Sequence, residues 1–113
     1  NVDMFIGIGG GPEGVLAACA LDAYDCHFQG RFIFDNEKDK IEAKSMGITD
    51  LYKKYELNEI VKGDSLFCAT GITNSEVLKG IKIDDDKFIS ETLVTHKNSN
   101  FKEIIKSVNI INE

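Results

Sequence analysis

The chain has 113 residues, 42% of them hydrophobic, and a formal net charge of −6. This length fits one small domain, and the hydrophobic content is that of a folded chain rather than a disordered one. The acidic balance and the scattered lysines exclude the clustered basic face of a nucleic-acid-binding surface, and no apolar run approaches the length that crosses a membrane.

The first segment joins an apolar run, a glycine-rich stretch and an alanine-rich run. Residues 2–6 predict a short buried strand and residues 12–23 predict a helix. Pro12 suits the first helical position, so we expect the helix to begin near Gly11 or Pro12. The first N–H groups of a helix have no partner within it and the positive end of the dipole lies there, so phosphate binds readily at such places.

Glu13 adds a carboxylate to this first helical turn. Beside a bound phosphate the carboxylate would be a like-charge clash, which a bridging divalent cation removes because hard cations take oxygen ligands from both groups. Residues 7–14 therefore suggest a phosphate site with a metal ligand. The alternative is a tight strand-to-helix turn in which Glu13 acts only on the dipole. The spacing matches neither the G-x-G-x-x-G fingerprint nor a Walker A loop.

Residues 28–34 predict a second strand, which would complete a right-handed βαβ unit with the first strand and helix. Residues 36–46 predict a charged second helix that Asp35 or Asn36 caps and Gly47 ends. We then expect a short helical turn, an extended or helical-turn segment and a third strand, at residues 50–55, 57–61 and 65–69.

Residues 70–74 follow this third strand. If the strands are parallel, they lie at the same sheet edge as the glycine-rich stretch, where open α/β sheets carry ligands. The plainer interpretation is a cap, made by Thr73 or Asn74, for a short helix over residues 75–79 that Gly80 closes.

The C-terminal part predicts two strands, at residues 88–96 and 101–108. The residues between them, 98–100, have the composition of a turn, so a β-hairpin is expected. The acidic run at residues 84–86 indicates a solvated loop, since EF-hand spacing is absent. Together these patterns predict an α/β fold: a layered sheet with parallel core strands, flanking helices and a C-terminal β-hairpin.

The cysteines are Cys19, Cys26 and Cys68. An odd count without C-x-x-C spacing is not typical of a disulfide framework or a zinc site, so we expect reduced thiols and a cytoplasmic protein. Cys26 adjoins His27, but a catalytic pair needs proximity in space rather than adjacency in sequence.

Several stretches together resemble the C-terminal portion of the class II fructose-1,6-bisphosphatases, a family of bacterial metal-dependent sugar-bisphosphate phosphatases. They are Gly-Ile-Gly-Gly-Gly-Pro-Glu-Gly-Val at 7–15, Gln-Gly-Arg at 29–31, Lys-Gly-Asp at 62–64, Ala-Thr-Gly-Ile-Thr at 69–73, Leu-Lys-Gly at 78–80 and Ser-Glu-Thr-Leu-Val at 90–94. They follow the family's order over nearly the whole chain. The chain departs from the pattern at Gly11 (an alanine in the family), at residues 25–27 (a glycine-containing turn) and at Glu91 (a histidine).

The resemblance implies that Glu13 completes a metal site for Mn²⁺ or Mg²⁺ and that Gly10 contacts substrate. It assigns no catalytic residue within this chain. It also implies that residues 1–113, which begin with Asn1 rather than Met, are a single C-terminal domain whose missing N-terminal domain carries most metal-binding carboxylates.

The activity implied for the full-length protein is hydrolysis of the 1-phosphate of fructose-1,6-bisphosphate in gluconeogenesis. Some members of the family also hydrolyse sedoheptulose-1,7-bisphosphate. We expect a homo-oligomer when the protein is full length, without nucleic-acid or membrane partners, and we expect the isolated chain to be inactive. The alternative is a non-catalytic α/β module that binds a phosphometabolite.

Overall fold

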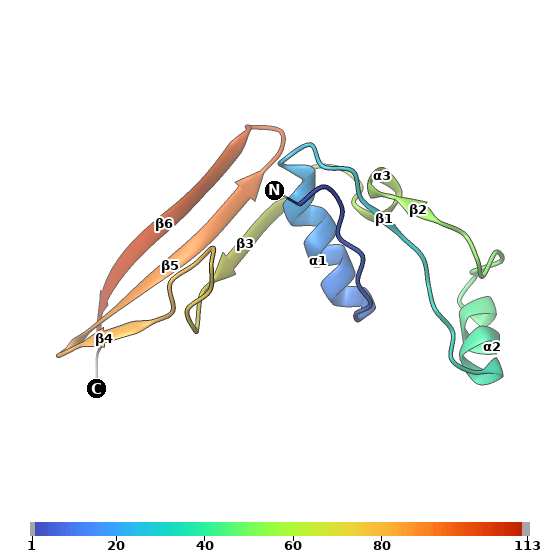
Figure 1. Ribbon diagram of the computed structural model, residues 1–113, viewed down its shortest axis with the longest axis horizontal. Helices are drawn as coiled ribbons and strands as arrows, with labels where there is room; N and C mark the ends of the chain where they lie inside the picture. Colours follow the sequence, from blue (N-terminus) through green and yellow to red (C-terminus); the bar gives the residue numbers. More distant parts are fainter. Residues whose placement is uncertain (1, 112–113) are drawn as a thin grey trace.

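The computed structural model describes residues 2–111 (Figure 1). Within them the elements are, in chain order, α1 (Gly11–Asp22), β1 (Gln29–Gly30), α2 (Glu37–Ser45), β2 (Tyr55–Glu56), α3 (Leu57–Ile60), β3 (Leu66–Thr70), β4 (Lys82–Asp84), β5 (Lys87–His96) and β6 (Phe101–Ile110). This mixture of helices and sheets is α/β, as predicted. No helix in the described range is long and apolar enough to cross a membrane.

The larger sheet is built around β5. Along its whole length β5 pairs with β6, from Lys87 opposite Ile110 to His96 opposite Phe101. On the other edge of β5, β3 pairs with residues 92–96 and β4 pairs with residues 87–89. The predicted C-terminal hairpin is therefore confirmed, and both of its strands extend slightly beyond the predicted bounds.

The parallel core predicted from the sequence is wrong, because every strand pair in the described part of the chain is antiparallel. Residues 2–6 form no strand. The strand expected at residues 28–34 is reduced to Gln29–Gly30, which pairs with β2. The strand expected at residues 65–69 is present as β3, but it pairs with the hairpin. A local pattern shows that a segment can form a strand and does not show its partner.

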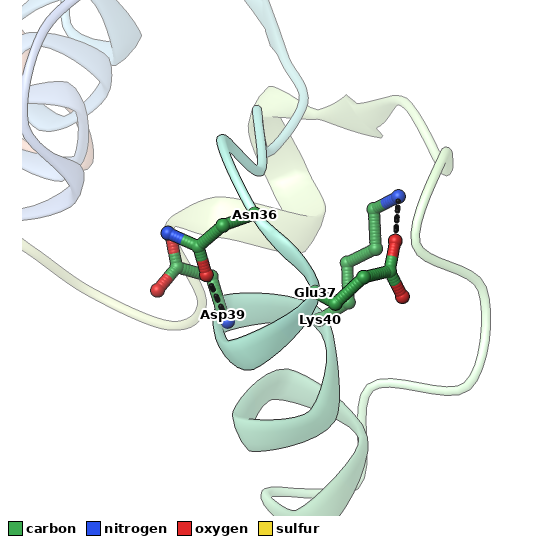
Figure 2. Close-up of polar contacts among 4 residues, drawn as sticks. All are labelled: Asn36, Glu37, Asp39 and Lys40. Carbon is green, nitrogen blue, oxygen red and sulfur yellow. Dashed lines mark hydrogen bonds and ion pairs between the residues drawn. The ribbon is translucent and has the colours of Figure 1, made fainter.

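Local signals predicted the two longer helices well. α1 begins at Gly11, and Pro12 is its second residue. The N-cap of α2 is Asn36, whose Oδ1 accepts a hydrogen bond from the Asp39 N–H at 2.9 Å (Figure 2). Gly47 follows this helix with φ +93°, the left-handed conformation that glycine adopts without a steric penalty.

The exposed face of α2 carries an ion pair between two residues one helical turn apart. Lys40 Nζ lies 2.9 Å from Glu37 Oε1 (Figure 2). This hydrogen bond, followed by the charge of the lysine, lowers the pKa of Glu37 from its ordinary value. The charged face predicted for this helix is thus solvated, and it contributes little to stability.

The helix predicted at residues 75–79 is wrong. The Ser75 hydroxyl accepts the Leu78 N–H at 3.0 Å, and the Ser75 N–H donates to the Leu78 carbonyl at 2.9 Å. Serine competes in this way with helical hydrogen bonds, and a closed turn results. Residues 50–55 likewise form no helix but a short turn, whereas the segment predicted at residues 57–61 is the one-turn helix α3.

Gly80 closes this turn in a place where a side chain does not fit. A Cβ at Gly80 would lie 2.7 Å from the Thr73 carbonyl carbon and 2.8 Å from the Ile72 oxygen, both backbone atoms. We expect Gly80→Ala to destabilise the complete protein by about 1–3 kcal/mol, the usual cost of overpacking. Gly30→Ala is the matched control, because its Cβ would meet Ile60 at an ordinary 3.6 Å. Chemical denaturation measures both, and equal midpoints would contradict the expectation.

The structure is elongated and has a small core. Its principal extents are 54 × 32 × 28 Å and its radius of gyration is 18.2 Å, whereas a compact domain of this length has about 13 Å. The apolar residues that are buried are mostly small ones, namely Ala18, Ala23, Ala43, Leu51 and Leu78. Much of the apolar surface within residues 2–111 is therefore exposed.

Candidate functional site

The candidate site is the start of α1. Gly10 is the N-cap with an extended backbone, φ −67° and ψ 153°, and its carbonyl accepts the Gly14 N–H at 3.0 Å. Among the described glycines only Gly47 and Gly63 have positive φ. The glycines of residues 7–14 are therefore not needed for an unusual backbone conformation, and what they provide here is space.

That space is open on most sides of the turn. A Cβ added at Gly9, Gly11 or Gly14 would meet nothing within 4 Å. A Cβ at Gly10 would instead collide with Oε2 of Glu13. The carboxylate of Glu13 thus folds back over Gly10, so the structure brings the two predicted site residues together.

The start of α1 suits a phosphate best with a cation bound beside it, because the helix N-terminus attracts an anion while the Glu13 carboxylate repels one. The first turn of α1 has no side-chain cap, and Glu13 is exposed and is its acidic residue. Its carboxylate takes part in none of the ion pairs found within residues 2–111. It is free to serve as one ligand of a hard cation, which binds through one or two carboxylates together with water and substrate phosphate.

The remaining ligands would have to come from outside the described residues. Within residues 2–111, no three His, Cys, Asp or Glu side chains gather closely enough to hold a metal ion. The donor set on this chain therefore fits one corner of a metal site rather than a whole site.

The end of β3 is not brought to this turn. α1 packs against β3, but Figure 1 shows that the two diverge from the end of α1, so that the start of α1 and the end of β3 lie apart. Thr70, the last residue of β3, hydrogen-bonds through its hydroxyl to the Thr92 hydroxyl at 2.8 Å. The sheet edge predicted to join residues 70–74 to the glycine-rich stretch required parallel strands; the described strands pair antiparallel and residues 2–6 form no strand, so this prediction does not hold.

A second group of polar residues lies at the hairpin turn, and the sequence analysis did not identify it. Nδ1 of His96 lies 2.6 Å from the Ser99 hydroxyl, and its Nε2 lies 2.6 Å from Asp64 Oδ1. These residues tie the hairpin turn to the loop before β3. No sequence signal could have found the group, since His96 and Asp64 are 32 residues apart.

An ion pair next to this group ties the hairpin to the end of α1. Lys97 Nζ lies 2.8 Å from Asp22 Oδ1, across 75 residues of sequence. The hydrogen bond to Asp22, with its charge, raises the pKa of Lys97. Both residues line an open hollow of about 560 Å³.

The same hollow is lined by Cys26 and His27. The Cys26 thiol is 3.8 Å from the Tyr24 carbonyl oxygen, to which it donates, so its described partner is the backbone rather than His27. The hollow is thus lined by residues from several parts of the fold, and its Cys26 and His27 do not form a nucleophile–base pair.

Comparison with known proteins identifies relatives for nearly the whole chain. The family profile described as "Bacterial fructose-1,6-bisphosphatase, glpX-encoded" matches residues 1–109. A protein of Synechococcus sp. (strain JA-2-3B'a(2-13)), named D-fructose 1,6-bisphosphatase class 2/sedoheptulose 1,7-bisphosphatase, is 33% identical over 97% of this chain. Proteins of the same name from Thermosynechococcus vestitus and Prochlorococcus marinus (strain MIT 9515) are 31% identical over 100% and 35% identical over 79% of the chain.

These relatives are much longer than the chain. The match covers 35% of the Synechococcus protein, 37% of the Thermosynechococcus protein and 31% of the Prochlorococcus protein. The chain therefore spans about a third of the length of the curated relatives it matches.

Proposed function

Because the chain belongs to the bacterial, glpX-encoded fructose-1,6-bisphosphatase family, we propose that it is the C-terminal domain of a metal-dependent sugar-bisphosphate phosphatase. In this proposal the start of α1 binds the phosphate that is removed. The reaction is hydrolysis of the 1-phosphate of fructose-1,6-bisphosphate, in gluconeogenesis. The name of the Synechococcus relative includes activity on both fructose 1,6-bisphosphate and sedoheptulose 1,7-bisphosphate, so the seven-carbon sugar is a second candidate substrate.

The observation that supports the proposal most directly is the Glu13 carboxylate folded over Gly10 at the N-terminus of α1. The unpaired N–H groups of the first turn can donate to phosphate oxygens and orient them. The exposed Glu13 carboxylate would hold Mn²⁺ or Mg²⁺ beside that phosphate. When bound, such a cation neutralises phosphate charge and activates water as a nucleophile.

The chain's own residues then act by position and charge. The open space next to Gly9 and Gly11 lets a phosphate approach the backbone closely. The positive end of the α1 dipole stabilises the negative charge of the phosphate, and this effect is limited to the first turn of the helix. Catalytic groups that polarise the attacking water would come from the part of the complete protein beyond this chain. A cytoplasmic location and a homo-oligomeric complete protein also stay predictions.

The test is phosphate release by the purified complete protein. We expect Mn²⁺- or Mg²⁺-dependent release of orthophosphate from fructose-1,6-bisphosphate, abolished by EDTA and restored by added metal. Fructose 6-phosphate is the matched control substrate, since it lacks the 1-phosphate, and it should release little. If the bisphosphate is bound but not hydrolysed under every metal condition, the alternative of a non-catalytic phosphometabolite-binding module is favoured instead.

A further inference from the structure

Residues 2–8 have the pattern of a strand but no partner within the described residues. Val2, Met4, Ile6 and Ile8 recur at every second position, which places them on one side of an extended chain. Their side chains and that of Phe5 are 75–87% exposed. No backbone hydrogen bond of a sheet involves them, because the segment contains no strand.

The direction of this segment also suits a sheet. In Figure 1 the dark blue chain descends from the N-terminus to the start of α1, α1 rises, and β3 descends again. A strand at residues 2–8 would thus run opposite to α1, the helix that follows it in the chain. The strands described within residues 2–111 include none that pairs with this segment.

The exposed area indicates how large the covering partner must be. The accessible surface is 9147 Å², whereas a compact monomer of 12.5 kDa has about 6,200 Å². The excess is roughly 3,000 Å², and a standard interface buries about 800 Å² on each partner. A second copy joined through one ordinary interface would leave most of this excess exposed.

The relatives provide a partner of sufficient size. About two-thirds of the length of the Synechococcus protein lies outside the region matched by this chain. A segment of that length, joined covalently, would bury more surface than an ordinary dimer interface and would lose less entropy on docking than a separate molecule.

We propose that in the complete protein residues 2–8 form a strand, paired by polypeptide that lies outside residues 1–113. This pairing fixes the chain that leads directly into Gly10 and Glu13, so it positions the candidate site. The inference rests on the exposed segment and on the length of the relatives, and it does not depend on phosphatase activity.

The test is hydrogen–deuterium exchange on the complete protein. We expect the amides of residues 4–8 to exchange at least about 100-fold more slowly than in an unstructured chain, as strand amides inside a sheet do. Exchange at the unstructured rate would overturn the proposal. Protection that disappears on dilution, together with dissociation of an oligomer, would assign the covering to a second copy and would also overturn it.

A matched pair of variants of the complete protein tests the apolar side of the segment. Ile6→Asp is expected to lower the melting temperature by about 5 °C or more. Met46→Asp is the control, because Met46 is 76% exposed but follows the charged helix α2, and it should melt like the wild type. Equal melting temperatures for all three proteins would contradict burial of Ile6. If Ile6→Asp does not fold, the exchange experiment still decides.

Activity distinguishes this proposal from the proposed function. Protected amides in a complete protein without phosphatase activity would refute the proposed function and support the proposed strand. An active enzyme with unprotected amides would refute the strand and leave the proposed function.

Discussion

Replacing Glu13 by glutamine in the complete protein is expected to lower kcat/KM by on the order of 100-fold or more, at unchanged fold. Glutamine keeps the size of the side chain and loses the anionic oxygen that balances a divalent cation beside phosphate. The carboxylate is exposed, so stability should fall by only about 0.3–1 kcal/mol through the dipole.

The metal dependence shows how the activity is lost. Part of the loss should be recovered at high Mn²⁺ or Mg²⁺, because a weakened ligand set lowers metal affinity and mass action offsets it. Glu13→Ala should behave alike. The measurement is kcat/KM against metal concentration for wild type and both variants, with thermal melts alongside. Identical rates and identical metal dependence would mean that Glu13 acts only on the helix dipole.

The isolated chain, residues 1–113, is expected to release no measurable phosphate from fructose-1,6-bisphosphate with Mn²⁺ or Mg²⁺. One carboxylate does not assemble a metal site, and residues 2–111 contain no cluster of three side chains that could hold the ion. Phosphoryl transfer is catalysed mainly by positioning and by electrostatic stabilisation. The isolated chain lacks most of the groups that would provide either.

The control for this experiment is the complete protein, assayed at the same molar concentration and in the same metal buffer. The isolated chain should also be assayed after a second purification step, which removes contaminating phosphatases. Robust Mn²⁺-dependent release that survives this step would contradict the prediction. It would mean that Glu13 finds its companion ligands within this chain.

Features decided by neighbours in sequence could be predicted from the sequence. The Asn36 cap lies three residues before its partner Asp39, and the hairpin has a four-residue turn between β5 and β6. The contact between Gly10 and Glu13 is equally local, because an N-cap residue and the third helical residue are neighbours on the helix surface. For these features the sequence pattern and the structure agree.

Features decided by distant partners could not be predicted. The strand potential of residues 65–69 was visible, but its antiparallel pairing depends on β5, more than twenty residues later. The tie between Asp64 and His96 has the same cause. At Ser75 the failure was local, because the hydroxyl outweighed the helical pattern of the following residues.

The position of β5, held between β6 on one edge and β3 and β4 on the other, sets an order of events during folding. Closing the four-residue turn between β5 and β6 costs less chain entropy than closing the longer loop between β3 and β5. β5 and β6 would therefore associate first, and β3 would then add to a template already formed. Because α1 packs against β3, α1 and the candidate site at its start would take their final place on the sheet only after β3 has joined the hairpin.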